Sequence, residues 1–328
     1  MISVQGLTKQ YGPVAAVTDV SFEVGRDQIV GFLGPNGAGK TTIMKIITGY
    51  HFPTRGTVTV DGFSVQEEPV AVKARLGYLP ESVPLYGDLT VEEYLSFIAG
   101  ARLIPAKARK AAIGEALEAC GLARSAGKRI ETLSKGYKQR VGLAQAIIHD
   151  PAILILDEPT TGLDPNQIIE IRALMKELGK RKTVILSTHI LQEVEAVCSQ
   201  VLIIHEGRIA AQGLPEVIAE TLTTGKGADT WELLLKFPNP AEAAEKAARL
   251  ADGIRLPPLP EHGGAVSLSF SAPGGEAEGE RIFDWAVREG VKILGMNRKK
   301  LSLEDIFVKL TGEHEGSPGD RGAAEEGA

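Results

Sequence analysis

One short stretch near the N-terminus constrains the fold of this chain more than any other part of the sequence. It runs from Gly34 to Thr42, reads GPNGAGKTT and fits the pattern G-x-x-x-x-G-K-[ST]. The residues before it, from Gln28 to Leu33, are mostly apolar and suit a buried strand. The residues after it carry, at helical spacing, Ile43, Met44, Ile46 and Ile47. The sequence therefore predicts a strand, a glycine-rich loop and a helix in succession, which together form a phosphate-binding loop.

The residue types in this loop each have a chemical reason to be there. The glycines at positions 34, 37 and 39 let the backbone curl, so that N–H groups and the helix start converge on the phosphates of a nucleotide. Lys40 would neutralise the β- and γ-phosphates and so assist catalysis, and the hydroxyl of Thr41 would ligate Mg²⁺. By itself the loop predicts an NTPase. The nucleotide-binding residues expected in it are Asn36, Gly37, Gly39, Lys40, Thr41 and Thr42.

Two carboxylates end a second predicted strand. The run from Ala152 to Leu156 is apolar and too short for a helix, and Asp157 and Glu158 follow it at once. Ligands of doubly wound sheets lie at the carboxyl ends of the parallel strands, so both acids should lie beside the phosphates that Lys40 holds. We expect Asp157 to hold Mg²⁺ and Glu158, which projects differently, to accept a proton from the attacking water.

Other polar residues stand at the ends of further predicted elements. His189 follows the strand from Thr183 to Thr188 at its carboxyl end, where contacts with a γ-phosphate are expected. Glu81 follows a short apolar strand that a proline ends. Asp164 is the expected N-cap of a helix that begins at Pro165.

Two more positions could contact a nucleotide. Ser134 can cap a helix that begins in the segment LSKGY from Leu133 to Tyr137, and a helix start can hold an anion. Tyr11 lies in the turn between two predicted strands. Its ring could stack on a nucleotide base or cover the sheet edge, and the residues themselves leave both interpretations open.

Composition narrows the classes of protein. The chain has 328 residues, 43% of them hydrophobic, enough for one large domain and a small one. The net charge of -6 argues against a broad nucleic-acid surface. Cys120 and Cys198 lack metal-ligand spacing and are expected to be reduced thiols. No apolar run approaches the ~20 residues that span a bilayer, so we expect a cytoplasmic chain and, for any membrane process, a separate membrane-spanning partner.

The patterns of strands and helices divide the chain. Residues 2 to 24 alternate as an antiparallel strand pair, and residues 82 to 150 are largely helical, with a capping box formed by Thr90 and Glu93. We expect a first domain over 1–222, a linker over 223–228, a small α+β domain over 229–312 and a disordered tail over 313–328. In the α+β domain one helix face is expected to consist of Ile282, Phe283, Ala286 and Val287.

With these residues laid out, the chain resembles the nucleotide-binding subunit of an ATP-binding cassette (ABC) transporter, from residue 2 to about residue 222. Gly34 to Thr42 resembles the Walker A loop of that family, and Leu154 to Glu158 its Walker B strand. Tyr11 falls at the adenine-stacking aromatic, Asp164 in the D-loop and His189 at the switch histidine. The resemblance implies an α/β P-loop NTPase fold with a mixed sheet core, an antiparallel β subdomain and a helical signature subdomain.

The sequence departs from the family pattern at two motifs. The signature LSGGQ reads LSKGY here, but it keeps Ser134 and Gly136, which in the family contact the γ-phosphate of ATP bound to the opposite subunit. Glu81 replaces the Q-loop glutamine; its oxygen can still approach Mg²⁺, but it lacks the amide donor and adds negative charge near phosphate. Both departures, with the segment 302–307, resemble the ABC-2 branch that serves gliding motility, multidrug export and polysaccharide export.

The resemblance also implies a mechanism and partners. Two copies facing head to tail would seal two Mg-ATP molecules between the Walker A loop of one and the signature of the other. ATP binding would close this homodimer and hydrolysis would open it. A separately encoded permease, docked on the 82–132 region next to Glu81 at the inner face of the cell membrane, would move with it, and the ABC-2 resemblance favours an exporter.

Two other functions explain fewer of these motifs. A soluble ABC ATPase that acts on ribosomes or DNA usually has two cassettes in one chain or a long coiled-coil insertion, and this sequence has neither. A small-molecule kinase or GTPase would leave the signature unexplained, and no Asn-Lys-x-Asp guanine motif occurs. The transporter subunit, without a nucleic-acid partner, remains the expectation that explains most motifs.

Overall fold

The computed structural model describes residues 2–215, 217–218, 229–239, 242–250, 265–272 and 275–299. The chain forms two compact units, divided after Pro215. The expected linker over 223–228, the segment 302–307 and the expected tail over 313–328 lie outside the described residues.

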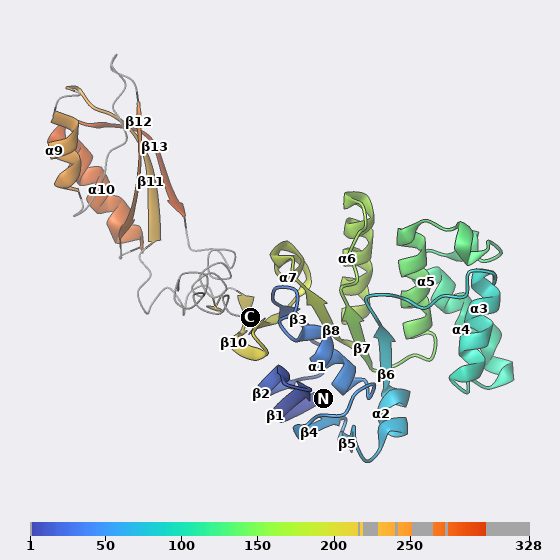
Figure 1. Cartoon of the computed structure of the whole chain (residues 1–328). Helices are drawn as coiled ribbons and strands as arrows, with labels where there is room; N and C mark the ends of the chain where they lie inside the picture. Colours follow the sequence, from blue (N-terminus) through green and yellow to red (C-terminus); the bar gives the residue numbers. More distant parts are fainter. Residues whose placement is uncertain are drawn as a thin grey trace, which may run out of the picture. The chain divides into compact units, whose positions relative to one another are not determined.

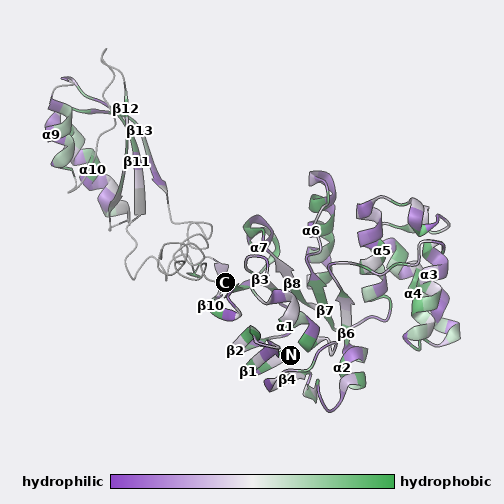
Figure 2. Cartoon of the chain, viewed as in Figure 1, coloured by the Kyte–Doolittle hydropathy of each residue, from purple (hydrophilic) through white to green (hydrophobic). Residues whose placement is uncertain are grey.

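A six-stranded sheet forms the centre of the first unit (Figure 1). Its order is β10-β9-β3-β8-β7-β6, with β10 antiparallel to β9 and every other neighbouring pair parallel. The middle strands β7 and β8 are buried along their whole length because both sheet faces are covered, and they are apolar except near their ends, as the green in Figure 2 shows. The strands are β3 (Ile29–Leu33), β6 (Leu76–Leu79), β7 (Ile153–Asp157), β8 (Thr183–Thr188), β9 (Gln200–His205) and β10 (Arg208–Gly213).

A second, antiparallel sheet covers one side of this unit, in the order β2-β1-β4-β5. The predicted pairing within residues 2 to 24 is confirmed, and Val20, Phe22 and Val24 alternate inward from β2. Helix α1 (Lys40–Ile47) packs its apolar side chains into the core that the two sheets share. The strands are β1 (Ile2–Tyr11), β2 (Val14–Val24), β4 (Arg55–Val60) and β5 (Phe63–Ser64).

Helices cover the other face of the six-stranded sheet, and α3, α4 and α5 gather beyond its β6 edge (Figure 1). The predicted capping box at the start of α3 is present: Thr90 N–H donates to Glu93 Oε2 at 2.8 Å, and Glu93 N–H donates to Thr90 Oγ1 at 3.3 Å. Besides α1, the helices among the described residues of this unit are α2 (Pro69–Arg75), α3 (Val91–Ala101), α4 (Ala106–Ala119), α5 (Lys135–Ile147), α6 (Pro165–Gly179) and α7 (Leu191–Val197), with short 3-10 turns at Ala123–Ser125 and Ile130–Thr132.

The alternation of side chains along β7 and β8 decides which way the polar residues at their ends face. Ile153 and Ile155 belong to the core on the α1 side, so Asp157, two residues on, faces α1. Leu186 belongs to the core on the helical side, so Thr188 faces α7. By the same rule Ser187 lies on the α1 side, next to Asp157.

The second unit is a three-stranded antiparallel sheet, ordered β12-β11-β13, with two helices on one face. This is the predicted α+β arrangement. Its elements are β11 (Asp229–Lys236), α9 (Ala243–Ala248), β12 (Val266–Ala272), α10 (Gly275–Glu289) and β13 (Lys292–Lys299).

The predicted face of α10 is wrong in part. Phe283 is 58% exposed and Val287 is 66% exposed, whereas the buried side consists of Ile282, Trp285 and Ala286. Successive helical residues are about 100° apart, so a face centred on Ile282 and Trp285 turns Phe283 and Val287 toward solvent. Packing against the sheet buries Trp285 in place of Phe283 and Val287.

His149, after α5, makes the stability of this fold depend on pH. Its Nε2 lies 3.1 Å from Leu76 O, and its buried Nδ1 has no hydrogen-bond partner among the described residues. Burial, aided by Arg102 and Lys182, lowers the pKa of His149 from 6.5 to about 4. Between these values the unfolded chain takes up a proton that the folded chain refuses, so the free energy of unfolding should fall as pH falls. Urea unfolding should show a weaker pH dependence in this window for His149→Gln; parallel curves would contradict the prediction.

Candidate nucleotide-binding site

The glycine-rich loop between β3 and α1 leaves no room for side chains at two of its positions. A Cβ on Gly34 would lie 2.2 Å from Ile204 O, and a Cβ on Gly39 would lie 2.6 Å from Ala16 O. Gly39 also has φ +103°, in the region that favours glycine. The loop can therefore approach β2 and β9 closely only because these residues are glycines.

The start of α1 offers N–H groups to an anion. The first N–H groups of a helix lack intrahelical partners, and the N-cap Gly39 has no side chain that could accept from them. Gly37, with φ +82°, and Asn36 are exposed on the loop, while Thr42 is half-buried in the first turn. A phosphate at this position would accept from the free N–H groups and lie at the positive end of the helix dipole.

The ammonium of Lys40 lies between the loop and an acid. Lys40 is only 5% exposed, and its Nζ donates to Gly34 O at 2.7 Å and to Pro35 O at 3.1 Å. Its Nζ also lies 3.6 Å from Glu158 Oε1. Burial lowers the pKa of Lys40, while the nearby carboxylates oppose that shift. A phosphate bound in the loop could accept from this ammonium in place of the two carbonyl oxygens.

Asp157 faces Thr41 at the end of β7. Thr41 Oγ1 donates to Asp157 Oδ1 at 3.1 Å, and Ser187 Oγ donates to the same oxygen at 2.6 Å. Asp157 Oδ2 is buried and has no hydrogen-bond partner among the described residues. Burial raises the pKa of this carboxyl, which a bound cation would reverse.

These oxygens fit Mg²⁺. Mg²⁺ prefers oxygen ligands and is usually held by one or two carboxylates together with substrate phosphates and waters. Asp157 supplies the carboxylate with a free oxygen, and Thr41 supplies the adjacent hydroxyl. Within the described part of the chain no group of three His, Cys, Asp or Glu side chains could hold a metal. A site here would therefore depend on phosphate oxygens as well as on the chain.

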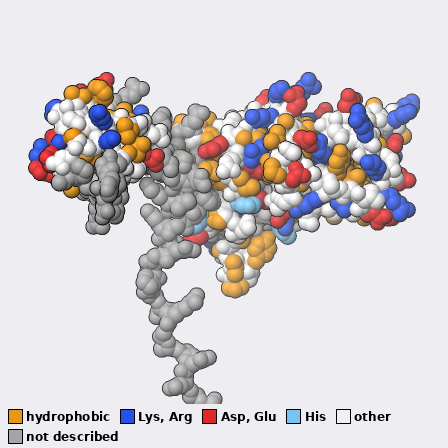
Figure 3. All heavy atoms as spheres, turned by 90° about the horizontal axis from the view of Figure 1, so that it is seen from above, with side chains coloured by type: hydrophobic (Ala, Val, Ile, Leu, Met, Phe, Trp, Pro, Cys, Tyr) orange, Lys and Arg blue, Asp and Glu red, His pale blue; other side chains and the backbone are white. Residues whose placement is uncertain are grey.

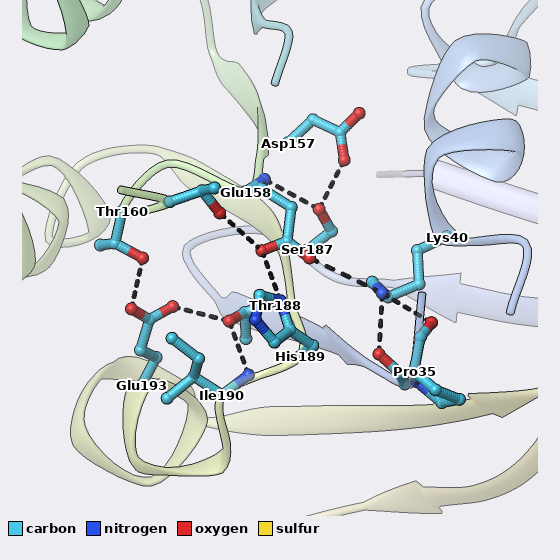
Figure 4. Close-up of polar contacts among 12 residues, drawn as sticks. Pro35, Lys40, Asp157, Glu158, Thr160, Ser187, Thr188, His189, Ile190 and Glu193 are labelled. Atoms are coloured by element: carbon cyan, nitrogen blue, oxygen red, sulfur yellow. Dashed lines mark hydrogen bonds and ion pairs between the residues drawn. The ribbon is translucent and has the colours of Figure 1, made fainter. Parts of the chain in front are cut away.

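Glu158 and His189 form a pair on the same side of the loop (Figure 4). Glu158 has φ +48°, uncommon outside glycine, which turns the chain sharply as it leaves β7. Its N–H donates to Ser187 Oγ at 3.0 Å, and its Oε2 accepts from Thr161 Oγ1 at 3.1 Å and lies 3.0 Å from His189 Nδ1. A carboxylate held by a histidine and a hydroxyl, with its other oxygen toward Lys40, is placed to take a proton from water.

Two of the expected site residues lie at the margin. Tyr11, at the end of β1, is 43% exposed; its ring centroid is 5.9 Å from that of His51, and Lys9 Nζ is 5.0 Å from it. Glu81 is exposed just beyond β6 and acts on the site through its charge, since it contributes to raising the pKa of both Lys40 and Asp157.

The signature residues lie beside the start of α6. Ser134 caps α5 by accepting from Tyr137 N–H at 3.4 Å, and Asp164 caps α6 by accepting from Gln167 N–H at 2.9 Å. A Cβ on Gly136 would lie 2.4 Å from the side chain of the same Gln167. The signature and the D-loop of one chain are therefore neighbours.

Sequence reasoning missed several polar residues of this site. Ser187 bridges Asp157 and Glu158, and Thr160, Thr188 and Glu193 form a buried group next to them. The sequence did contain one signal for them. Ser187 and Thr188 end an otherwise apolar strand immediately before His189, and buried hydroxyls need hydrogen-bond partners. Glu193, four residues after His189, carried no such signal because a glutamate in an amphipathic helix normally faces water.

The site is that of a P-loop ATPase. It combines a phosphate-binding loop, a pair of acids at the end of β7 and a histidine at the end of β8. The family described as ABC transporter matches residues 17–161, and an AAA domain family matches residues 128–195. The ABC transporter ATP-binding protein YxlF of Bacillus subtilis is 35% identical over 310 residues, 94% of this chain and 99% of that protein. The chain belongs to the family of ABC transporter ATP-binding proteins and is an ABC ATPase.

Other relatives and solved structures agree. The Nod factor export ATP-binding protein I of Burkholderia orbicola is 32% identical over 95% of this chain and 97% of its own length. The bacitracin transport ATP-binding protein BcrA of Bacillus licheniformis is 34% identical over 95% and 97%. The structure of the ATP-binding subunit of an ABC transporter has a TM-score of 0.62 at 33% identity, covering 68% of this chain and 93% of that one.

A dimeric ATP-binding cassette bound to ADP and Pi in a post-hydrolysis state is also similar. Its TM-score is 0.60 at 25% identity, and the match covers 65% of this chain and 98% of that one.

Among the helices described for the present chain, none is both long enough and apolar enough to cross a membrane.

Proposed function

We propose that this chain hydrolyses Mg-ATP as one half of a homodimer and thereby drives a separately encoded membrane permease, in the direction of export. The observation that carries the proposal is the cluster of Lys40, Asp157, Glu158 and His189 at the carboxyl end of the sheet. The names of two relatives, a Nod factor export protein and a bacitracin transport protein, favour a transporter and an exporter.

The residues divide the chemistry among them. The loop and Lys40 bind the β- and γ-phosphates, and Thr41 and Asp157 hold the Mg²⁺ that neutralises the developing charge. Glu158 takes the proton from the attacking water, and His189 holds the Glu158 carboxylate and contacts the γ-phosphate. Glu81 contributes an oxygen and a negative charge at the edge of this site. Tyr11, with its exposed ring, stacks on the adenine.

The dimer completes each site. Gly136 lies against Gln167 of its own α6, and Ser134 uses its hydroxyl to cap α5. In a two-fold arrangement Ser134, Gly136 and Asp164 of one subunit face ATP on the other. A similar cassette that is dimeric with ADP and Pi supports this arrangement.

The permease docks beside the helical subdomain, at the inner face of the cell membrane. A cavity of about 280 Å³ lies between this subdomain and the sheet core, lined by residues that include Tyr50, Lys73, Tyr78, Ile98 and Arg102. Next to it Tyr86 packs edge-on to Tyr94 and Phe97, and Tyr86 and Phe97 are both exposed. On the face of the first unit shown in Figure 3, hydrophobic side chains lie among interspersed charges of both signs.

Copurification tests the transporter assignment. If a neighbouring gene encodes a membrane protein, the full-length chain expressed together with that protein should copurify with it and hydrolyse ATP faster in the complex. Phe97→Ser should weaken copurification without lowering the ATPase rate of the isolated chain, because Phe97 lies outside the site. ATPase activity that is stimulated by ribosomes or DNA, in a chain that binds no membrane partner, would contradict the proposal.

The second unit is proposed to stabilise or regulate the dimer. Its described residues form their own core, which includes Trp231, Leu268 and Trp285. A chain ending at Thr223 should therefore stay soluble and bind ATP, but dimerise more weakly or lose control of its hydrolysis rate. Thermal melts, ATP titration and size-exclusion chromatography of this truncation check the prediction. An insoluble or non-binding product would show that the two units fold as one domain.

A further inference from the structure

Glu193 is a buried carboxylate with no role in the chemistry described above. It lies in the first turn of α7 and is 0% exposed. Its Oε1 accepts a hydrogen bond from Thr160 Oγ1, and its Oε2 accepts from Thr188 Oγ1 at 2.7 Å. Both threonines are themselves buried. Burying a carboxylate is costly, so its hydrogen bonds must be satisfied by these neighbours.

The two threonines belong to the segments that carry the catalytic pair. Thr160 follows Glu158 by two residues, and Thr188 immediately precedes His189. His189 Nδ1 lies 3.0 Å from Glu158 Oε2. The backbone joins Glu158 to Thr160 and Thr188 to His189, and hydrogen bonds join both threonines to Glu193. Together with the Glu158–His189 contact these links form a closed ring, in which Glu193 lies opposite that contact (Figure 4).

The acid is better suited to this place than a neutral residue. A carboxylate only accepts hydrogen bonds, so both hydroxyl protons must point at it. This orientation leaves the oxygen of Thr188 free to accept from Ile190 N–H at 3.0 Å, which shapes the turn directly after His189. Arg172 of α6 supplies a positive charge, with its guanidinium 3.8 Å from Glu193 Oε1.

We propose that Glu193 is a positioning residue. Its hydrogen bonds connect the segment after Glu158 to the segment before His189, and so keep the Glu158 and His189 side chains in contact. The inference rests on the proposed roles of Glu158 and His189 in hydrolysis. Losing the tie would let the two segments move separately, and a displacement of about 1 Å at a reacting group can cost 10²-fold in rate.

The first test compares Glu193 with Glu195, an exposed glutamate on the same helix. Glu193→Ala in the full-length chain should lower kcat about 10- to 100-fold with an unchanged KM for ATP, because the phosphate-binding loop is untouched. Glu193→Gln, which keeps one acceptor, should lose less. Glu195→Ala should behave as wild type. Normal kcat in folded Glu193→Ala, or equal losses in kcat for both alanine variants, would overturn the proposal.

A double-mutant cycle separates positioning from a general structural role. In a His189→Ala background Glu193→Ala should cause little further loss of kcat, because the contact that Glu193 maintains is already gone. Fully additive losses would overturn the proposal. If Glu193→Ala does not fold, Thr188→Val takes its place in both experiments, since it removes the hydroxyl and keeps the shape.

Glu158→Gln, measured in parallel, distinguishes failure of the proposed hydrolysis chemistry from failure of the positioning role of Glu193. Should it retain normal turnover, the proposed function of the site fails and this inference fails with it. If Glu158→Gln is inactive while folded Glu193→Ala and Thr188→Val keep normal kcat, only the positioning role of Glu193 is wrong.

Discussion

Replacement of Glu158 by glutamine is expected to lower ATP turnover about 10²- to 10⁴-fold while ATP binding persists. The amide keeps the size of the carboxylate but cannot accept a proton from water. The groups that bind phosphate are unchanged in this variant, because Lys40 keeps its hydrogen bonds to the loop carbonyls of Gly34 and Pro35. The variant should therefore collect as an ATP-bound dimer, visible by size-exclusion chromatography and by single-turnover assays.

The substitution also removes a negative charge from a crowded site. Glu158 Oε1 lies 3.6 Å from Lys40 Nζ, so the neutral amide leaves this ammonium freer for phosphate and should not weaken ATP binding. Glu195→Gln, on the exposed side of α7, is the matched control and should hydrolyse ATP at the wild-type rate. Near-normal turnover by Glu158→Gln would show that another group accepts the proton.

Mixing two inactive variants should restore activity if the signature works on the opposite subunit. Lys40→Ala removes the ammonium of the Walker A loop, and Ser134→Arg places a bulky cation where the signature serine caps α5. Each variant alone should lose nearly all turnover. A heterodimer of the two has one site with both lesions and one intact site, so an equal mixture should recover about one quarter of the wild-type sites.

The structure supplies a sharp control for this experiment. Lys40 and Glu158 of one chain are 3.6 Å apart and belong to the same site. A mixture of Lys40→Ala with Glu158→Gln therefore leaves a lesion in both sites of every heterodimer and should recover nothing. Recovery in this control, or none in the Ser134→Arg mixture despite confirmed heterodimers, would contradict the shared-site arrangement.

Much of the site could be predicted because its determinants are local. The loop from Gly34 to Thr42 needs particular residue types at particular positions, and such requirements are legible in the sequence itself. Asp157 and His189 end apolar runs that only buried parallel strands explain, and such ends meet at one edge of a sheet. Asp157 contacts Thr41, and Glu158 lies beside both Lys40 and His189.

Tertiary packing decided the features that depend on residues far apart in the chain. The position of β8 between β3 and β7 brings Ser187 to Asp157, and α7 returns Glu193 to Thr160 and Thr188. No local pattern marks these partners, since hydroxyls and glutamates are compatible with both buried and exposed positions. Their roles arise only where separate segments meet.

Contacts between distant segments also explain why the predicted face of α10 was wrong in part and why the chain turns sharply at Glu158. Phe283 and Val287 satisfied a helical period, but Trp285 packs against the sheet of the second unit instead, and only tertiary packing shows which side of the helix is buried. Glu158 has φ +48° although it is not glycine, a conformation that local preference disfavours. Its hydrogen bonds to Ser187 and Thr161 and its contact with His189 hold it there. The sequence by itself determined the fold class and the residue types at the strand ends. Contacts between distant segments decided how those residues are held.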